Sequence, residues 1–398
     1  MLFRSCETNY SEAKGDLATV FLEKMLKSNT LGGNSCSVIP QNWLFLTSYK
    51  KYREKLLKNE SWSIVARLGT KSFQTPMWDF NVMLISIQHK KPSTTQLFIG
   101  LDVSNAQYAS LKDDALKISE LKTVNQLEQS NNPDGRVIIE DQNSNISMLS
   151  NFADSYQGIS PADFPMFGRF FWELLKVNSD WWLWQSTVKS TINYGGKELV
   201  LWYSELQRKV KEEGTAYIRG SDGWGKDGIS VSAMSILPVT ISKGQANDTN
   251  AAVIIPKENE YLNAIWCFCA SPSFNEEVRK IDQTLKVTNA SLVKVPFDLA
   301  HWQKVADEKY PNGLPKPYSD DATQWLFHGH PIKADNPLQV AVARLLGYRW
   351  PAENDSGMEL ADEARELITA VKAFDNLSDN DGIFCIPRSE EHTSELQS

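Results

Sequence analysis

The chain has 398 residues, of which 41% are hydrophobic and 23% are charged, so its apolar content is sufficient for two or three folded domains. It contains no apolar run long enough for a membrane helix, and no charged segment leads into an apolar one as in a signal peptide. The formal net charge of −8 argues against a general nucleic-acid coat but is compatible with one local basic groove. These properties predict a cytoplasmic protein without a membrane partner.

The two ends of the chain differ from the residues between them. Residues 388–398 (RSEEHTSELQS) lack apolar periodicity, and they resemble a translated short-read sequencing adaptor, as do residues 2–5 (LFRS). We therefore expect residues 1–5 and 388–398 to be scars and the rest to be an internal fragment of a longer gene product. A natural polar tail is the alternative interpretation.

The first predicted element is a helix over residues 13–31. Asp16 is suited to the N-cap or the first turn, and Gly32-Gly33 provides the stop. Apolar residues recur at helical spacing along this segment: Leu17, Val20, Phe21 and Met25.

Three short apolar runs then predict strands at residues 35–39, 61–68 and 81–87. Pro40 ends the first strand, and a second helix is expected to begin near Thr47 or Ser48. The second and third strands are joined by a loop that is too long for a tight hairpin and contains Phe73. This order of helices and strands is typical of the second half of an α/β sheet domain.

The rest of the chain is predicted to contain a linker and two further regions. Residues 96–155 are polar and weakly patterned, as in a linker with short strands or helices. Short strands and turns follow, and then come helices around residues 260–269, 301–309 and 338–346. The expected segments are therefore a sheet domain at 6–95, the linker at 96–155, a strand-rich domain at 156–300 and a helical region at 301–387.

Neither the cysteines nor the histidines form a metal-binding pattern. The five cysteines are odd in number and scattered, which favours a reducing compartment without a disulfide framework. Cys267 and Cys269 lack a second pair at zinc spacing, and His328 and His330 have no obvious third ligand. The sequence therefore predicts no metal site.

One glycine-rich motif matches a nucleotide-binding fingerprint only formally. Residues 223–228 (GWGKDG) fit GxGxxG, but the residues that follow look extended rather than helical, so no helix N-terminus would face a phosphate. One interpretation is an ordinary glycine-rich loop. The other is a DNA-binding loop, in which Arg219 and Lys226 meet a phosphate backbone and Trp224 stacks.

The first ninety residues resemble a known family of enzymes. The strings GDLATVFLEKML, LGG, SVIPQNWLFLTSYKKYREKLL and ARLGTKSFQTPMWDFNVMLI look like the later half of an adenine-specific DNA methyltransferase. The resemblance covers residues 10–88 and is closest to the γ-type enzymes of BREX phage-defence systems, the PglX methyltransferases. It continues more diffusely through the strings RFFWEL, AYIRG, SILPVTISKG, KVPFDLAHW, TQWLFHGHP and LQVAVARLLGYRWP.

The resemblance implies a fold and a chemistry. The fold is α/β: the later strands of a Rossmann-like sheet with a reversed last strand, then an α+β target recognition domain and a helical tail. The cofactor is S-adenosyl-L-methionine, and the partners are double-stranded DNA and other phage-defence proteins. The target adenine is flipped from the duplex, and an Asn-Pro-Pro-Tyr motif orients its amine. Neither that motif nor a glycine-rich cofactor loop occurs in this chain, so the chain alone is expected to be inactive.

Three residues fall on functional positions of that family. Phe73 matches the aromatic that stacks on the flipped adenine, with core packing as the alternative. Phe21 matches a position that lines the pocket for the cofactor adenine, with the buried face of a helix as the alternative. Asp16 matches an Asp or Asn position beside the cofactor, although N-capping alone would explain it.

Two other functions remain open. The first alternative is the methylase and specificity part of a fused restriction endonuclease-methyltransferase. The second is a DNA sequence-recognition subunit without chemistry. The sequence upstream of residue 6 would discriminate between them, because a nuclease motif favours the first and the absence of both methyltransferase motifs favours the second.

Overall fold

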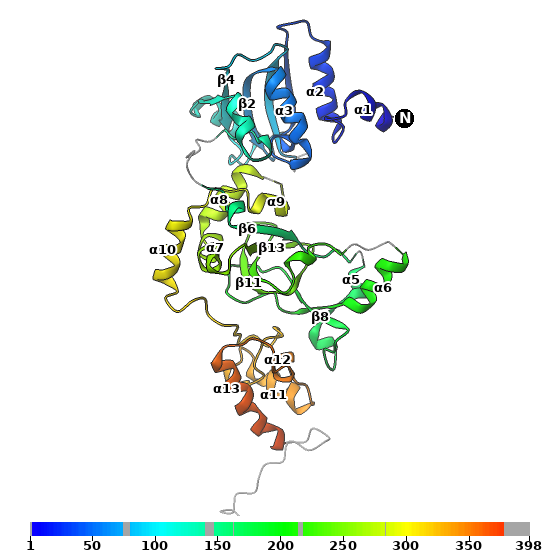
Figure 1. Cartoon of the computed structure of the whole chain (residues 1–398), viewed down its shortest axis with the longest axis vertical. Helices are drawn as coiled ribbons and strands as arrows, with labels where there is room; N and C mark the ends of the chain where they lie inside the picture. Colours follow the sequence, from blue (N-terminus) through cyan, green and yellow to red (C-terminus); the bar gives the residue numbers. More distant parts are fainter. Residues whose placement is uncertain are drawn as a thin grey trace, which may run out of the picture. The chain divides into compact units, whose positions relative to one another are not determined.

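The computed structural model describes residues 2–74, 80–139, 147–161, 163–213, 218–282 and 284–377. It contains two compact units, of which the first comprises residues 1–147 and 275–296 and the second comprises residues 148–274 and 297–398. Figure 1 shows the helices and strands of both units. Residues 388–398, expected to be a scar, lie outside the described residues, whereas residues 2–5 belong to helix α1 (Leu2–Asn9).

The first unit is built on a five-stranded sheet with the order β1-β3-β2-β4-β5. Strand β3 is antiparallel to both β1 and β2, so it is a reversed strand between two parallel ones. Strand β4 is parallel to β2, and β5 is antiparallel to β4. The strands are β1 (Asn34–Pro40), β2 (Ser61–Gly69), β3 (Val82–Gln88), β4 (Leu97–Asp102) and β5 (Lys122–Asn125).

This topology confirms the sheet expected from the sequence. The three predicted strands form within about a residue or two of their expected bounds, and the third runs in the reversed direction that the methyltransferase resemblance implies. The structure adds β4 and β5 to the same sheet, although residues 96–155 have the composition of a linker. The polar sequence of β5 (KTVN) is compatible with a strand because β5 lies at the edge of the sheet and buries only Val124 fully.

Helices cover both faces of this sheet. On one face, α2 (Leu17–Ser28) and α3 (Lys50–Asn59) pack on the strands in one apolar cluster with the corner at residues 41–49. On the other face, α4 (Ala109–Ile118) contributes Ala115 and Leu116 to a smaller cluster with the ends of β2, β3 and β4. The result is the α/β layering of a Rossmann-like domain.

The corner after β1 is built by a proline and a buried tryptophan. Pro40 is the last residue of β1, and short 3-10 turns at Asn42–Leu44 and Thr47–Tyr49 lead into α3. Trp43 is 1% exposed, and its ring packs edge-on against Tyr52 and Trp62 with centroids 5.4 Å and 5.7 Å away. Trp43 therefore holds the turn by packing.

The second unit contains two four-stranded sheets. One has the order β11-β10-β13-β6 and is antiparallel throughout, with helix α7 packed on β10 and β13. The other has the order β12-β8-β9-β7. The strands are β6 (Ala153–Gln157), β7 (Gly168–Phe170), β8 (Trp181–Gln185), β9 (Leu199–Trp202), β10 (Asp227–Ser232), β11 (Val239–Lys243), β12 (Ala246–Asn247) and β13 (Ala251–Pro256).

Most of the remaining helices follow the second unit's sheets in the chain, as the sequence predicts. The expected helices near residues 260–269, 301–309 and 338–346 are α7, α10 and α11. The bounds are α5 (Phe164–Phe167), α6 (Tyr203–Glu213), α7 (Leu262–Cys269), α8 (Pro272–Ile281), α9 (Asn289–Leu292), α10 (Leu299–Lys309), α11 (Pro337–Leu345), α12 (Pro351–Asn354) and α13 (Asp362–Val371). In the described part of the chain, no helix has the length and apolarity needed to cross a membrane.

Candidate functional site

Phe73 lies in the loop that leaves the carboxyl end of β2. Phe73 is 42% exposed and is not among the buried residues of the core. Gly69, the last residue of β2, pairs with Val82, the first residue of β3. The loop therefore starts and ends at one edge of the sheet, where α/β proteins commonly bind ligands. Residues 75–79 of this loop lie outside the described residues.

Asp16 and Phe21 belong to helix α2, which packs beside β1. Asp16 is the N-cap, and its Oδ1 accepts a hydrogen bond of 2.8 Å from the backbone N–H of Ala18. Phe21 is 57% exposed, so the prediction that it lies on the buried face of the helix is wrong. The buried residues of α2 are Thr19, Val20, Leu22, Glu23 and Leu26. The exposed Leu17, Phe21 and Met25 instead form an apolar stripe at i, i+4 and i+8.

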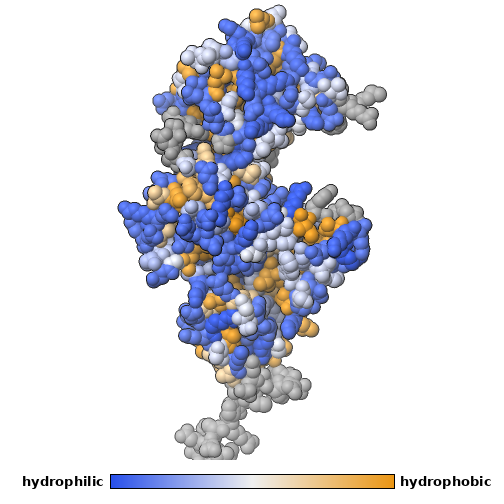
Figure 2. All heavy atoms as spheres, viewed as in Figure 1, coloured by the Kyte–Doolittle hydropathy of each residue, from blue (hydrophilic) through white to orange (hydrophobic). Residues whose placement is uncertain are grey.

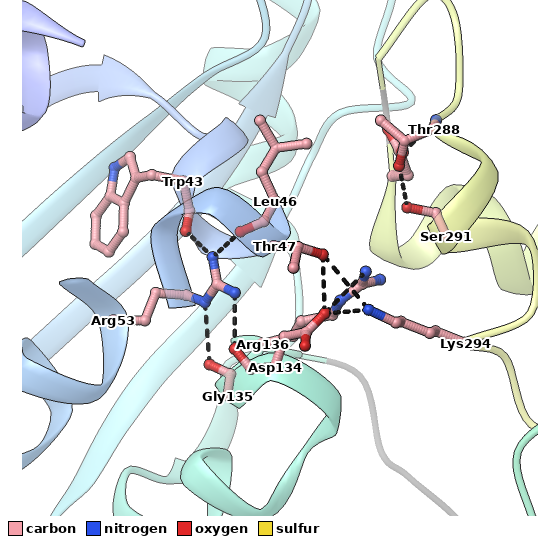
Figure 3. Close-up of polar contacts among 11 residues, drawn as sticks. Trp43, Leu46, Thr47, Arg53, Asp134, Gly135, Arg136, Thr288, Ser291 and Lys294 are labelled. Carbon is pink, nitrogen blue, oxygen red and sulfur yellow. Dashed lines mark hydrogen bonds and ion pairs between the residues drawn. The ribbon is translucent and has the colours of Figure 1, made fainter. Parts of the chain in front are cut away.

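The corner after β1 is held by Arg53, a buried arginine of α3 (Figure 3). Its guanidinium donates to the carbonyls of Trp43 and Leu46 at 2.5 Å and 2.7 Å. It also donates to the carbonyls of Asp134 and Gly135 at 2.7 Å and 3.2 Å. Burial lowers the pKa of Arg53 to about 10, which still leaves the side chain charged at neutral pH.

A second polar contact joins this corner to the segment that returns from the second unit. The Asp134 carboxylate accepts a hydrogen bond of 3.0 Å from Thr47 Oγ1 and forms an ion pair with Lys294 (Figure 3). Burial by itself would raise the pKa of Asp134, but the bonds from Lys294 and Thr47 outweigh it and the pKa is lowered. Asp134 is therefore ionised, and it fixes residue 294 to the sheet unit.

The position of Arg53 in the sequence indicates that its side chain is buried, although arginine is not an apolar residue. Arg53 falls at helical spacing on the same stripe as Tyr49, Tyr52, Leu56 and Leu57, all of which are buried. A charged residue within a buried stripe is expected to have hydrogen-bond partners inside the protein, because an unpaired buried charge is strongly unfavourable.

In the second unit, Trp224 belongs to a group of exposed and half-buried aromatic rings. Trp182 and Tyr203 are stacked with centroids 3.8 Å apart, and Trp224 meets both rings edge-on at 5.3 Å and 5.6 Å. Trp182 is 37% exposed. The face shown in Figure 2 is mainly hydrophilic, with apolar residues gathered in small groups. The aromatic group offers flat π-faces, which suit stacking.

Lys226 and Arg219 lie in the same loop region as Trp224, and both are exposed. Lys226 lines an open cavity of about 600 Å³, together with Asp154, Tyr156, Asp227, Lys257 and Asn259. Asp227 is paired with Lys243, which also binds Glu359 at 2.7 Å. The glycine-rich motif at residues 223–228 runs directly into strand β10, which confirms that it is not followed by a helix.

Lys197 is a buried lysine with no predicted role. It is 1% exposed, and its Nζ donates to Gln185 Oε1 at 2.8 Å and lies 5.4 Å from the centroid of the Trp325 ring. Burial, together with the smaller effect of the nearby charge of Lys243, lowers the pKa of Lys197 to about 7. Its ammonium therefore loses its proton near neutral pH.

We expect the free energy of unfolding of the 398-residue chain to rise between pH 7 and 9 because of Lys197. An unfolded lysine, with a pKa of about 10.4, stays protonated over this range while the folded one does not, and the difference is worth about 2 kcal/mol. The rise would appear in urea unfolding curves at pH 7, 8 and 9. Lys197→Met should remove it, whereas Lys189→Met, on an exposed residue, should keep it. If the free energy of unfolding rose equally with pH in the wild type and in Lys197→Met, Lys197 would not be the source of the rise.

The histidine and cysteine pairs act locally in the fold. His328 Nδ1 accepts from the backbone N–H of His330 at 3.0 Å, and His330 Nδ1 accepts from that of Ile332 at 3.2 Å. Cys267 and Cys269 are buried thiols of α7. Among the residues that the structure describes, no three His, Cys, Asp or Glu side chains gather as metal ligands.

Comparisons with known proteins point to the first unit. Residues 2–73 match the family of Eco57I restriction-modification methylases. A comparison with curated protein sequences finds no match. This matched segment ends at Phe73 and contains β1, β2 and the corner between them.

Three solved structures are similar to the chain at low sequence identity. One is a nuclease-deletion mutant of the Type ISP restriction-modification enzyme LlaGI in complex with a DNA substrate mimic, with 11% identity and a TM-score of 0.43 over 77% of this chain and 38% of that one. The second is the Type IIL restriction-modification enzyme MmeI in complex with DNA, with 12% identity and a TM-score of 0.42 over 94% of this chain and 50% of that one. The third is the DrdV–DNA complex, with 9% identity and a TM-score of 0.41 over 77% of this chain and 41% of that one.

The chain thus spans half or less of each of these three proteins. The family match shows that residues 2–73, with the corner after β1 and the start of the loop after β2, are similar to a restriction-modification methylase domain.

Proposed function

We propose that the chain is part of an S-adenosylmethionine-dependent DNA methyltransferase that acts on the exocyclic amine of adenine at a specific sequence, in phage defence or restriction-modification. The match of residues 2–73 to restriction-modification methylases carries this proposal. The direction of strand β3, antiparallel to β1 and β2, supports it, because the resemblance implies a reversed last strand. The resemblance to BREX methyltransferases narrows the proposed setting to phage defence, with other proteins of such a system as further partners.

Phe73 is proposed to stack on the flipped adenine. The ring is exposed at the carboxyl edge of the sheet, and a base removed from the duplex needs an aromatic or apolar surface to replace its neighbours. The Asn-Pro-Pro-Tyr motif that would orient the amine does not occur in this sequence. The 398-residue chain alone is therefore proposed to be inactive, and methyl transfer by it would contradict this statement.

Phe21 and Asp16 are proposed to face S-adenosylmethionine, whose sulfonium supplies the methyl group. Phe21 fits an aromatic contact with the cofactor adenine, because more than half of its surface is exposed next to strand β1. Strand β1 pairs with β3 and, within the described residues, with no other strand. Asp16 fits less fully, because one of its carboxylate oxygens already caps α2.

The second unit is proposed to recognise double-stranded DNA. Trp182, Tyr203 and Trp224 provide aromatic faces, and Lys226 and Lys257 place two cations at one open cavity. Arg219 is proposed as a further phosphate contact. The complexes of LlaGI, MmeI and DrdV were solved with DNA or a DNA mimic, which is the ligand proposed here.

Lys226→Ala is expected to weaken DNA binding of the intact gene product similarly on all sequences. Removing one phosphate contact should reduce the slope of log Kd against log salt by about one. Lys189→Ala, another exposed lysine of the second unit, is the control and should leave the slope unchanged. Binding is measured by fluorescence anisotropy at several salt concentrations, and an unchanged slope in Lys226→Ala would exclude this contact.

The function itself is tested by comparing the methylomes of cells with and without the full-length gene. Loss of N6-methyladenine at one sequence motif is the expected result. An unchanged methylome would contradict the methyltransferase proposal and favour a recognition subunit without chemistry. Methylation together with DNA cleavage by the purified gene product would identify the fused restriction endonuclease-methyltransferase.

A further inference from the structure

Helix α4 carries a lysine whose side chain turns into the protein rather than into solvent. Lys112 is 2% exposed, and its Nζ donates to the carbonyls of Leu68 and Ala106 at 2.5 Å and 2.6 Å. The carbonyls of Val103 and Ser104 lie 3.4 Å from the same nitrogen. All four partners are backbone oxygens at or just beyond the carboxyl ends of β2 and β4. Burial lowers the pKa of Lys112, although Asp102 acts in the opposite direction.

Leu68, the β2 residue that Lys112 contacts, lies next to Gly69, after which the loop that carries Phe73 begins. Gly69 has φ of +72°, and a Cβ there would lie 2.8 Å from the Cβ of Ser104, so only glycine fits without a shift. Ser72 Oγ then donates to the Gly69 carbonyl at 2.8 Å. The first residues of the loop are thus fixed against the residues that follow β4.

Helix α4 contacts the loop at a second point. Lys71 Nζ lies 5.9 Å from the ring centroid of Tyr108, which stands directly before the first residue of α4. Both ends of the loop also rest on this helix through apolar side chains. Leu68 before the loop and Val82 after it share one buried cluster, which Leu84, Val103, Ala115 and Leu116 complete.

We propose that Lys112 is a positioning residue that fixes the Phe73 loop at the carboxyl edge of the sheet, and that helix α4 with β4 and β5 supports this loop. The assignment of a base-stacking role to the loop rests on the proposed function, whereas the positioning rests on the contacts of Lys112 alone. The ammonium holds these segments together because its two short bonds, to the carbonyls of Leu68 and Ala106, tie the carboxyl end of β2 to the residues after β4.

The positioning is tested on the 398-residue chain by hydrogen exchange of the backbone amides. Lys112→Met is expected to speed exchange in residues 69–74 by roughly tenfold, because the loop start loses its donor. Exchange in residues 34–40 of β1 should not change. Lys117→Met on the same helix is the matched control, since Lys117 is exposed and pairs with Asp113 and Asp114. Unchanged exchange in residues 69–74 would overturn the proposal.

A second variant keeps the test decisive if Lys112→Met prevents folding. Tyr108→Ala removes an exposed ring and its contact with Lys71, and it should speed exchange in residues 69–74 about twofold. The absence of any change in this variant would overturn the role of α4 as support for the loop.

The link to the base is tested separately in the intact gene product. Lys112→Met should lower kcat for methyl transfer about five- to tenfold with little change in the Kd for DNA, and it should add nothing in a Phe73→Ala background. Additive effects of the two changes would overturn positioning through Phe73. Faster exchange in residues 69–74 combined with normal methyl transfer by Phe73→Ala would instead uphold the positioning and contradict the proposed function of Phe73.

Discussion

Phe73→Ala is expected to lower the rate of single-turnover methyl transfer by the intact gene product about 10- to 100-fold. Stacking of a base on an aromatic side chain contributes about 1–3 kcal/mol, which corresponds to this range of rates. The Kd for DNA should change much less, because the proposed function has the second unit hold the duplex and Phe73 contact only the flipped base. When 2-aminopurine replaces the target adenine, its fluorescence in the complex with Phe73→Ala should differ from that in the complex with the wild type. The reason is that the extruded base has lost its stacking partner in the variant.

Phe80→Ala is the matched control for this prediction. Phe80 is the other described phenylalanine of the same loop, and it is 57% exposed compared with 42% for Phe73. Its replacement should leave methyl transfer within about twofold of the wild type. Phe73→Trp, which retains an aromatic face, should keep most of the activity. Equal losses of DNA binding and methyl transfer in Phe73→Ala would indicate a structural role instead.

Arg53→Met is expected to lower the free energy of unfolding of the first unit by about 3–5 kcal/mol. The methionine fills much of the same volume, but the carbonyls of Trp43, Leu46, Asp134 and Gly135 lose their donor. The loss exceeds that of an ordinary surface substitution because the buried carbonyls of Trp43 and Gly135 lose a charged donor, whereas the carbonyl of Leu46 keeps the N–H of Tyr49 at 3.1 Å. The corner at residues 41–49 should loosen first.

The measurement is urea unfolding of the 398-residue chain, combined with hydrogen exchange of residues 41–49 and 134–136. Lys51→Met is the control, because Lys51 is an exposed cation of the same helix and should change the free energy by less than about 0.5 kcal/mol. Arg53→Lys retains the charge but not the planar fork, so it should lie between the wild type and Arg53→Met. A loss below 1 kcal/mol in Arg53→Met would show that the four bonds contribute little.

Strand β1 and helix α2 of the first unit could be predicted because each is specified by residues within or directly beside it. The apolar run that ends at Pro40 gives β1, and Asp16 caps α2 as its residue type favours. The direction of β3 followed from the family resemblance rather than from periodicity, since alternating residues do not show which neighbour a strand will pair with.

Phe21 shows why burial was predicted less well than secondary structure. Four apolar residues recur along α2 at helical spacing, yet Leu17, Phe21 and Met25 are exposed while Val20 is buried with Leu22 and Leu26. Apolar residues lie on two sides of helix α2, but the sheet covers only one of them. The sequence pattern could not show which of these two sides is buried. Which side is buried is decided by the direction in which α2 lies against β1.

The sequence by itself predicted the strands β1, β2 and β3, the helices α2, α7, α10 and α11, and the resemblance of residues 10–88 to DNA methyltransferases. Only the tertiary structure decided that β4, α4 and β5 belong to the sheet unit, and which backbone carbonyls Arg53 and Lys112 bind. The physical reason is that these two cations bind backbone carbonyls, which every residue possesses, so their partners leave no mark in the sequence. Long-range closure of the fold brings Arg53 to Asp134 and Lys112 to Leu68, and it thereby fixes the corner and the Phe73 loop.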